Sequence, residues 1–157
     1  MRILIAIAAV LAVLSLVAVV ARLPPPTAQP AKATAGRFAV QEGGGKTVLD
    51  RLSGLRWQQG FSASPMDWAA AKTWCSANTP ALPGSGWRLP TVRELDTVVD
   101  RQTQQPASDA VFGATPSEYF WTSTPWVGGG SAWYVYFVSG FSFYSGSSST
   151  NRVRCVR

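Results

Sequence analysis

Hydrophobic and polar positions divide the chain into a long apolar run, a short polar stretch and a region of mixed pattern. Residues 3–21 are apolar or small apart from Ser15, and Arg2 and Arg22 flank them. The run has about the 20 residues needed to span a membrane, and it exceeds the apolar core of a typical signal peptide. We predict a hydrophobic helix over 1–22 that is a transmembrane anchor or a cleaved signal peptide. Either role would export the rest of the chain to the periplasm or the cell exterior.

A stretch without apolar periodicity follows this run. Residues 23–36 contain three consecutive prolines and then mostly Thr, Ala, Gln and Lys. This composition is typical of a semi-extended, disordered tether. We therefore predict a Pro/Ala-rich linker at 23–36 and one folded domain at 37–157, a length that suits a single core.

Two helices are predicted in the first half of the domain, after short strands. The first helix is expected over 65–77, with Ser64 as its cap and a proline at its first position. The second is opened by the capping box Thr91–Glu94 and is expected to end near Asp100. Apolar segments bounded by turn residues predict the strands that precede both helices, at 38–40, 47–50 and 55–58.

The last forty residues have a β pattern. Residues 133–138 alternate between two sets of apolar and aromatic side chains, which is the period of a strand. The preceding stretch, 102–118, is polar, holds two prolines and is predicted to be a loop without a helix. Two helices followed by an antiparallel sheet predict an α+β fold. Strands are expected in this part at 119–123, 133–138, 141–144 and 151–157.

The composition of the chain excludes several kinds of catalytic and metal site. The chain has no His, two Cys and 14% charged residues. It therefore lacks the residues for a Ser-His-Asp or Cys-His nucleophile, a four-thiolate zinc site or an iron–sulfur cluster. Only two acidic residues follow Asp100, which argues against a calcium site. We predict no catalytic residue, no metal or cofactor, and no enzyme activity.

The net charge of +6 does not indicate a nucleic-acid partner. Eleven of the fourteen cations and all eight carboxylates lie from Arg37 onward, so this part carries +3. Nucleic-acid binders cluster their cations in a stripe, whereas these cations are scattered except at the C-terminal end. There, Arg152, Arg154 and Arg157 are expected on a solvent-exposed strand face or in an ion pair.

Export would place Cys75 and Cys155 in an oxidising compartment, where a structural disulfide is the usual outcome. A reactive thiol is the alternative. Neither cysteine has a His or a neighbouring thiol in the sequence to activate it.

Several motifs then occur in a fixed order between residues 47 and 157. They are GLRWQ at 54–58, DWA at 67–69, WC at 74–75, GWRLPT at 86–91, EL at 94–95, YFWTST at 119–124, AWYV at 132–135 and VRCVR at 153–157. This series resembles the Lcl C-terminal domain family, a bacterial family largely of unknown function.

The resemblance implies a C-type-lectin-like fold, in which two helices flank a twisted antiparallel sheet. In C-type lectins a disulfide ties the first helix to the last strand, and Cys75 and Cys155 occupy these two places. The calcium-dependent sugar motifs of true C-type lectins, Glu-Pro-Asn and Gln-Pro-Asp, are missing. Formylglycine-generating enzymes share this type of fold, so a modifying enzyme with a free thiol is the alternative function.

The richest candidate binding region is 134–151. It combines aromatic side chains with Ser, Gly and Thr and has no acidic residue, a composition found in adaptable binding surfaces. We predict a membrane-held recognition or adhesion module that binds an extracytoplasmic glycan or protein there. The ligand-binding residues predicted are Trp126, Tyr134, Tyr136, Phe141, Phe143, Tyr144 and Asn151.

Other interpretations of this region stay open. Trp133, Val135 and Phe137 would fill the core while the intervening tyrosines pack against a neighbour. The residue types also match those that diversity-generating retroelements introduce into C-type-lectin-like proteins, and a structural envelope component is a further alternative. Of the seven tryptophans, only Trp126 falls outside the family motifs and is expected at the surface.

Overall fold

The computed structural model of the protein describes residues 36–41 and 46–157. The helix predicted at 1–22 lies outside the described residues, as does the predicted linker except for Gly36. Among the residues that are described, no helix is long and apolar enough to cross a membrane.

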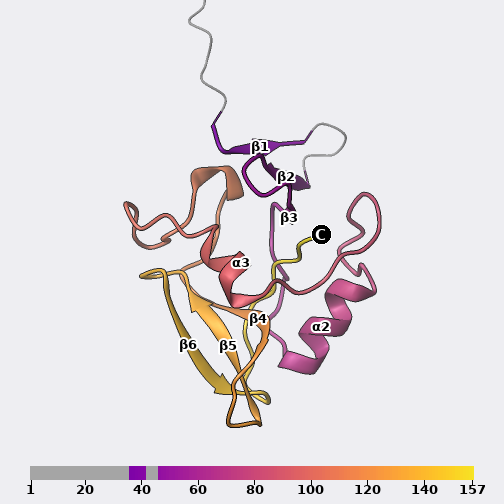
Figure 1. The fold of residues 1–157 in the computed structure, drawn as a ribbon, viewed down its shortest axis with the longest axis vertical. Helices are drawn as coiled ribbons and strands as arrows, with labels where there is room; N and C mark the ends of the chain where they lie inside the picture. The colour runs from indigo at the N-terminus through magenta and orange to yellow at the C-terminus, as the bar shows by residue number, and fades with distance from the viewer. Residues whose placement is uncertain (1–35, 42–45) are drawn as a thin grey trace, which may run out of the picture. The chain divides into compact units, whose positions relative to one another are not determined.

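The first of two antiparallel sheets confirms the strands predicted after the linker (Figure 1). It consists of β1 (Phe38–Val40), β2 (Thr47–Asp50) and β3 (Arg56–Gln58), in that order. Val48 and Trp57 lie opposite each other in the register and are both fully buried.

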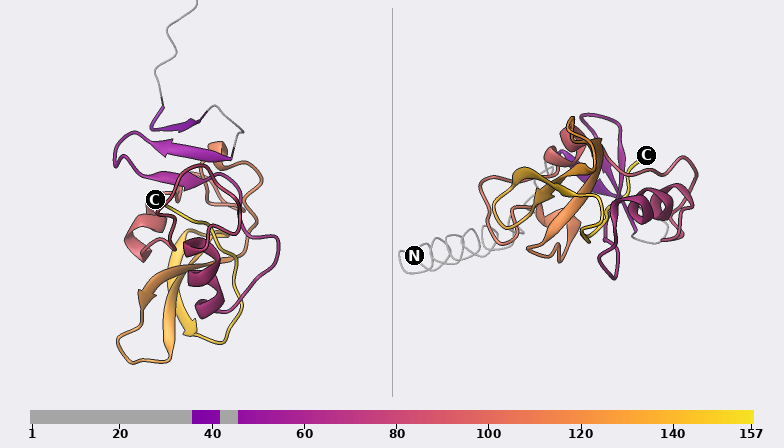
Figure 2. Two further views of the ribbon diagram at one scale, coloured as in Figure 1. Left: turned by 90° about the vertical axis from the view of Figure 1, so that its right-hand side faces the viewer. Right: turned by 90° about the horizontal axis from the view of Figure 1, so that it is seen from below.

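The second sheet has the order β4 (Tyr119–Pro125), β5 (Ser131–Tyr136) and β6 (Phe141–Gly146). The strand predicted at 133–138 is therefore confirmed, although it begins and ends two residues earlier. The described residues form an α+β fold in which α3 and α2 lie along the second sheet (Figure 2).

The first predicted helix begins later than expected. Helix α2 (Trp68–Ser76) is capped by Asp67, whose carboxylate accepts the backbone N–H of Ala70 at 2.8 Å. Ser64 and Pro65 therefore lie outside the helix, so the predictions of Ser64 as its cap and Pro65 as its first residue are wrong. Asp67 caps the helix in place of Ser64 because a carboxylate is a strong hydrogen-bond acceptor at a helix N-terminus.

The second helix is shorter than expected. Thr91 and Glu94 form the predicted capping box at the start of α3 (Val92–Asp96), which ends four residues before Asp100. A β-branched run at 97–99 follows, and such side chains favour helices less. One short 3₁₀ helix, η1 (Ala110–Phe112), occurs in the stretch predicted to be a helix-free loop.

An ion pair holds the start of α3 and makes stability depend on pH. The Arg88 guanidinium donates to both Glu94 carboxylate oxygens, at 2.6 and 2.8 Å, and this hydrogen bonding lowers the pKa of Glu94 from 4.5 to about 2. A carboxylate with a lowered folded-state pKa stabilises the protein above its unfolded pKa. That contribution is lost as the pH falls from about 4.5 to about 2.

We expect Glu94→Gln to lower the free energy of unfolding by about 1 kcal/mol at pH 7, because Arg88 is half-exposed and solvent screens the pair. Urea unfolding at pH 7 and at pH 3 measures this loss, and the difference from the unmodified protein should shrink at pH 3. Glutamine retains a capping-box acceptor, so the helix start is preserved. Equal stabilities at pH 7 would contradict the prediction.

The C-terminal segment 151–157 is extended but is not the regular strand predicted. It pairs with several neighbours over one or two residues each. Val156 bridges to Trp57 and to Arg88, and Arg152 bridges to Phe120. Because no single partner runs alongside it, no continuous ladder forms. The segment instead connects β3 of the first sheet to β4 of the second.

The predicted disulfide between Cys75 and Cys155 is confirmed, and it fastens α2 to the C-terminal segment. The hydrophobic core consists of two clusters, and the C-terminal segment contributes to both. The first contains Val48, Trp57, Leu95, Val98, Phe112, Phe120, Val135, Phe137 and Val156. The second contains Ala71, Cys75, Leu82, Trp87, Leu89, Trp121, Ala132, Val153 and Cys155.

The three C-terminal arginines do not share a solvent-exposed face. Arg152 forms one of the two predicted arrangements, an ion pair with Glu118 at 2.7 Å. Arg157 lies over the ring of Trp87. For Arg154 both expectations are wrong, because it is fully buried and pairs with no carboxylate of the described residues. Its long side chain reaches backbone carbonyls and aromatic rings in the core instead.

The turn between β5 and β6 depends on Gly140. This residue has φ +74°, and a Cβ there would overlap the side chain of Val99. We expect Gly140→Ala to lower the free energy of unfolding by about 2–3 kcal/mol, since both backbone strain and overpacking oppose it. Gly130 is the matched control, because it has φ +63° and open space around it. Thermal unfolding of the Gly140 and Gly130 variants separates backbone strain from overpacking. Equal losses of stability in the two variants would exclude overpacking.

Candidate functional site

One face of the second sheet presents rows of aromatic side chains. In the register, Tyr119 lies opposite Tyr136, which lies opposite Phe141. Directly opposed residues project to the same face of a sheet, and so do residues two apart on one strand. Tyr134 and Phe143 therefore belong to this face as well, which we call the tyrosine face. It comprises Tyr119, Tyr134, Tyr136, Phe141 and Phe143.

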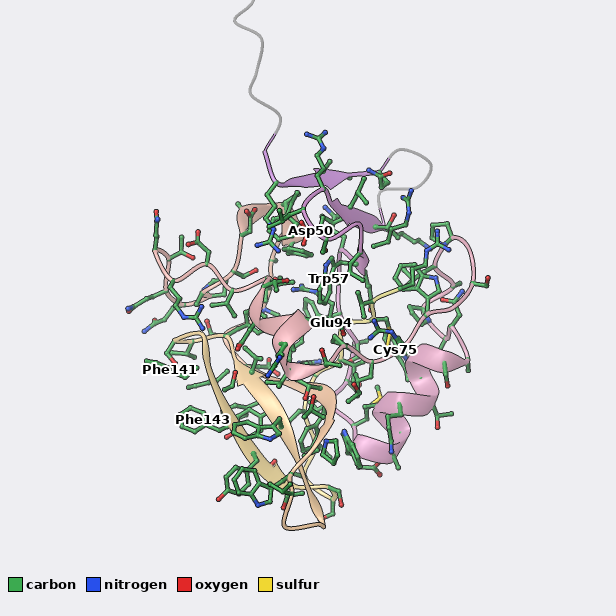
Figure 3. All side chains as sticks on the ribbon, in the orientation of Figure 1. Asp50, Trp57, Cys75, Glu94, Phe141 and Phe143 are labelled. Carbon is green, nitrogen blue, oxygen red and sulfur yellow. A yellow bond between two sulfur atoms is a disulfide. The ribbon has the colours of Figure 1, made fainter. Side chains whose placement is uncertain are left out.

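The side chains of the tyrosine face contact one another but remain accessible. The ring of Tyr119 lies 5.1 Å from that of Tyr134 and 4.5 Å from that of Tyr136. Phe141 is 61% exposed and Phe143 is 49% exposed. Figure 3 shows both phenylalanines pointing away from the body of the domain. The tyrosine rings therefore support one another, and the two phenylalanines are open to solvent.

A buried residue on the same side of the sheet anchors the tyrosine face to the core. Trp121, opposite Tyr134, is fully buried, and its indole N–H donates to the backbone carbonyl of Met66 at 2.9 Å. The ring of Tyr134 packs against Trp121 at 6.3 Å. The face therefore rests on one core cluster, and its geometry is fixed by the fold.

The tyrosine face is electrically neutral at physiological pH. Burial and the neighbouring Tyr119 and Tyr136 phenols raise the pKa of Tyr134 above 10. Burial and the Tyr119 phenol do the same for the pKa of Tyr136. Tyr134 and Tyr136 therefore keep their protons at pH 7, and their hydroxyls can both donate and accept hydrogen bonds.

A pocket of 330 Å³ lies where the tyrosine face meets the residues after β6. We call it the polar pocket. Tyr119 and Tyr134 form its aromatic part, and no charged side chain lines it. The other lining residues are Ser145, Ser149, Thr150 and Asn151.

Two polar atoms at this pocket have no hydrogen-bond partner. Six buried side-chain nitrogen or oxygen atoms of the described residues are unpartnered, and they include Asn151 Nδ2 and Ser145 Oγ. Asn151 is 6% exposed, and its backbone is held by reciprocal hydrogen bonds to Met66. Buried polar groups normally find a partner in the protein, in water or in a ligand.

The opposite face of the second sheet has a different role. Phe120 and Val135 are buried there in the first core cluster, and the Ser142 hydroxyl donates to the Asp96 carboxylate of α3 at 2.8 Å. This part of the face is covered by α3. On the tyrosine face, by contrast, Tyr119, Phe141 and Phe143 are exposed.

A separate aromatic group lies on the covered side, near the β4–β5 turn. Trp126 stacks on Tyr144 at 3.9 Å, and Trp133 contacts both rings. We call this group the tryptophan cluster. The expectation that Trp133 fills the core is wrong, because it is only half-buried. Trp126 is likewise half-buried by stacking and is not freely exposed.

The structure thus separates the predicted ligand-binding residues into two groups. Four lie on the tyrosine face, and Asn151 lines the pocket at its end, while Trp126 and Tyr144 belong to the tryptophan cluster. Sequence reasoning missed Tyr119 and Ser145 as site residues. Tyr119 could have been found from the period of two along 119–121, which puts Tyr119 and Trp121 on one face.

The described residues contain no group of three His, Cys, Asp or Glu side chains able to hold a metal ion. Both cysteines are joined to each other. The tyrosine face and the polar pocket present aromatic rings, hydroxyls and an amide, which can stack on apolar surfaces and exchange neutral hydrogen bonds.

Comparison with known proteins supports the family seen in the motifs. No curated protein matches the chain. The model of the Lcl C-terminal domain matches residues 46–157, which is most of the chain and includes both sheets from β2 onward. The C-type-lectin-like relationship remains a prediction. The chain belongs to the Lcl C-terminal domain family.

Proposed function

We propose that this protein is an exported recognition module that binds a glycan or a protein ligand through its tyrosine face. The observation that carries the proposal is a neutral, accessible aromatic surface that ends in a polar pocket. Tyrosines offer large contact area, little conformational freedom to lose and a hydroxyl for hydrogen bonding. Both the apolar face of a sugar ring and a peptide side chain can use such a surface.

A matched pair of substitutions on β6 tests the face. Phe143 and Tyr144 are neighbours and are each 49% exposed, yet they lie on opposite faces of the sheet. Ligands are identified first on a glycan array and by pull-down from envelope extracts with the full chain. We expect Phe143→Ala to weaken binding at least tenfold and Tyr144→Ala to leave it within twofold. The reverse result would move the binding surface to the tryptophan cluster.

The location belongs to the same proposal. Residues 3–21 would hold the domain at the membrane, facing the periplasm or the cell exterior, or would be removed to release it. The Cys75–Cys155 disulfide supports an oxidising compartment. Cell fractionation followed by carbonate extraction tests this. Recovery of the reduced protein in the cytosol would contradict export.

The alternative is a modifying enzyme related to formylglycine-generating enzymes. Such chemistry needs a free thiol, whereas Cys75 and Cys155 are joined. Mass spectrometry of the native protein after iodoacetamide treatment distinguishes the two functions. An unmodified, bridged protein supports binding, and quantitative alkylation without reductant would favour the enzyme.

A further inference from the structure

The polar pocket has hydrogen-bonding capacity that the protein itself leaves unused. Asn151 Nδ2 is a donor only, and Ser145 Oγ both donates and accepts. Both atoms are buried and unpartnered, and both residues line the pocket. Leaving such groups unpaired is costly, so a group that pairs with both would be favoured there. That group must carry an acceptor for the amide of Asn151.

The charge around the pocket selects a neutral group. No charged side chain lines the pocket. The nearby ion pair between Arg152 and Glu118 is closed, at 2.7 Å, and Arg152 also donates to the backbone carbonyl of Ser62. A carboxylate, phosphate or sulfate would lose its hydration in the pocket without gaining a counter-charge. The acceptor is therefore an uncharged oxygen.

The aromatic part of the pocket adds a third requirement. Tyr119 and Tyr134 line the same pocket as Asn151 and Ser145, and their rings contact each other at 5.1 Å. A ligand that fits has an apolar surface next to its polar group. An acetamido group meets all three conditions, because it offers a carbonyl acceptor, an N–H donor and a methyl group.

We propose that the polar pocket binds the acetamido group of an N-acetylated amino sugar. Asn151 Nδ2 donates to the carbonyl oxygen, Ser145 Oγ accepts the N–H, and the methyl group packs on the tyrosine rings. The sugar chain continues along the tyrosine face and stacks on its aromatic side chains. This inference rests on the proposed function and narrows its ligand to one class of glycan.

Three tetrasaccharides with the same β-1,4 linkage test the assignment by calorimetry on the full chain. Chitotetraose carries the acetamido group, its deacetylated form carries an amine, and cellotetraose carries a hydroxyl. We expect chitotetraose to bind at least tenfold more tightly than either of the others. Equal binding of chitotetraose and cellotetraose would overturn the acetamido pocket but leave the tyrosine face as a glycan site.

A substitution inside the polar pocket provides a second test of the acetamido assignment. Asn151→Leu removes the donor without adding charge, and the lost side chain makes no hydrogen bond through Nδ2, so the melting temperature should not fall. We expect it to weaken chitotetraose binding at least tenfold and cellotetraose binding less than twofold. Ser148→Ala, at an exposed position outside the pocket, is the control.

Two results would contradict the sugar assignment. One is chitotetraose binding that Asn151→Leu leaves unchanged. The other is tighter binding of an N-acetylated peptide amide than of chitotetraose, which would assign the pocket to a protein ligand. Neither result depends on the Phe143 and Tyr144 comparison, so the two proposals fail separately.

Discussion

Replacing both Cys75 and Cys155 by alanine is expected to lower the free energy of unfolding by about 4–5 kcal/mol. The two residues are 80 positions apart in the sequence, so the bridge removes much conformational freedom from the unfolded chain. The native contacts that it supports join α2 to the C-terminal segment. A domain of this size is typically stable by about 5–15 kcal/mol, so the loss is a large part of the total. Urea unfolding monitored by tryptophan fluorescence measures it.

Reduction of the unmodified protein is the control for this variant. Dithiothreitol breaks the bridge without removing the two sulfur atoms from the core, whereas the alanine variant removes both. Similar losses in the two experiments would attribute the effect to the cross-link. A double variant within about 1 kcal/mol of the oxidised protein would contradict the prediction, because the entropic model requires more for a loop of this length.

Arg154→Ala is expected to cost about 4 kcal/mol of stability. The guanidinium donates from Nε to the carbonyl of Gly60 at 3.0 Å and from Nη2 to Thr115 Oγ1 at 2.9 Å. It also lies 4.7 Å from the centre of the Phe112 ring. The substitution leaves those acceptors unpaired and opens a cavity among the rings. Burial lowers the pKa of Arg154 to about 9, so the side chain that is lost is still a cation at pH 7.

Two further substitutions define what Arg154 does. Arg93 on α3 is exposed, and Arg93→Ala should change stability by no more than about 0.5 kcal/mol. Arg154→Lys keeps the positive charge but lacks the planar fork that reaches several acceptors at once. We expect its stability to lie between those of the unmodified protein and the alanine variant. If lysine restores full stability, charge alone explains the effect and the hydrogen-bond geometry does not.

Local signals were sufficient for most elements of the fold. The strands β1 to β6 follow from alternation and turn residues, and the capping box at Thr91 places α3 correctly. The start of α2 was misplaced because Ser64 and Asp67 both qualify as caps, and only the hydrogen bond to Ala70 decides between them. The end of α3 was misplaced because Val98 and Val99 continue the apolar pattern of a helix, although the β-branched side chains at 97–99 favour helices less.

The burial of Arg154 was beyond sequence reasoning. An arginine between valine and cysteine has the pattern of an exposed position. Its surroundings are three phenylalanines, the backbone carbonyls of Gln59 and Gly60 and the Thr115 hydroxyl, all from distant parts of the chain. No local sequence pattern indicates these neighbours of Arg154, because they come together only when the two sheets are joined. The rings that face Arg154 belong to Phe112, Phe120 and Phe137.

The candidate site could be predicted only in part, because it too depends on contacts between distant parts of the chain. The period of two puts Tyr134 and Tyr136 on one face of β5. The register of the β5–β6 hairpin then decides that Phe143, rather than Tyr144, joins them. The polar pocket could not be predicted, because Ser145 and Asn151 line it together with Tyr119 only after the C-terminal segment has paired with β4.

The pairing of the C-terminal segment also has a consequence for folding kinetics. Arg56, Ser62 and Met66 donate backbone hydrogen bonds to residues 151–157, so β3 and the strand-to-helix connection lack these partners until the last part of the domain is available. Contacts so distant in sequence slow folding, because loop closure precedes the gain from pairing. A ribosome adds residues 151–157 after the rest of the described domain. Both core clusters are therefore incomplete until these residues are available, and strand edges that pair with them stay unpaired until then.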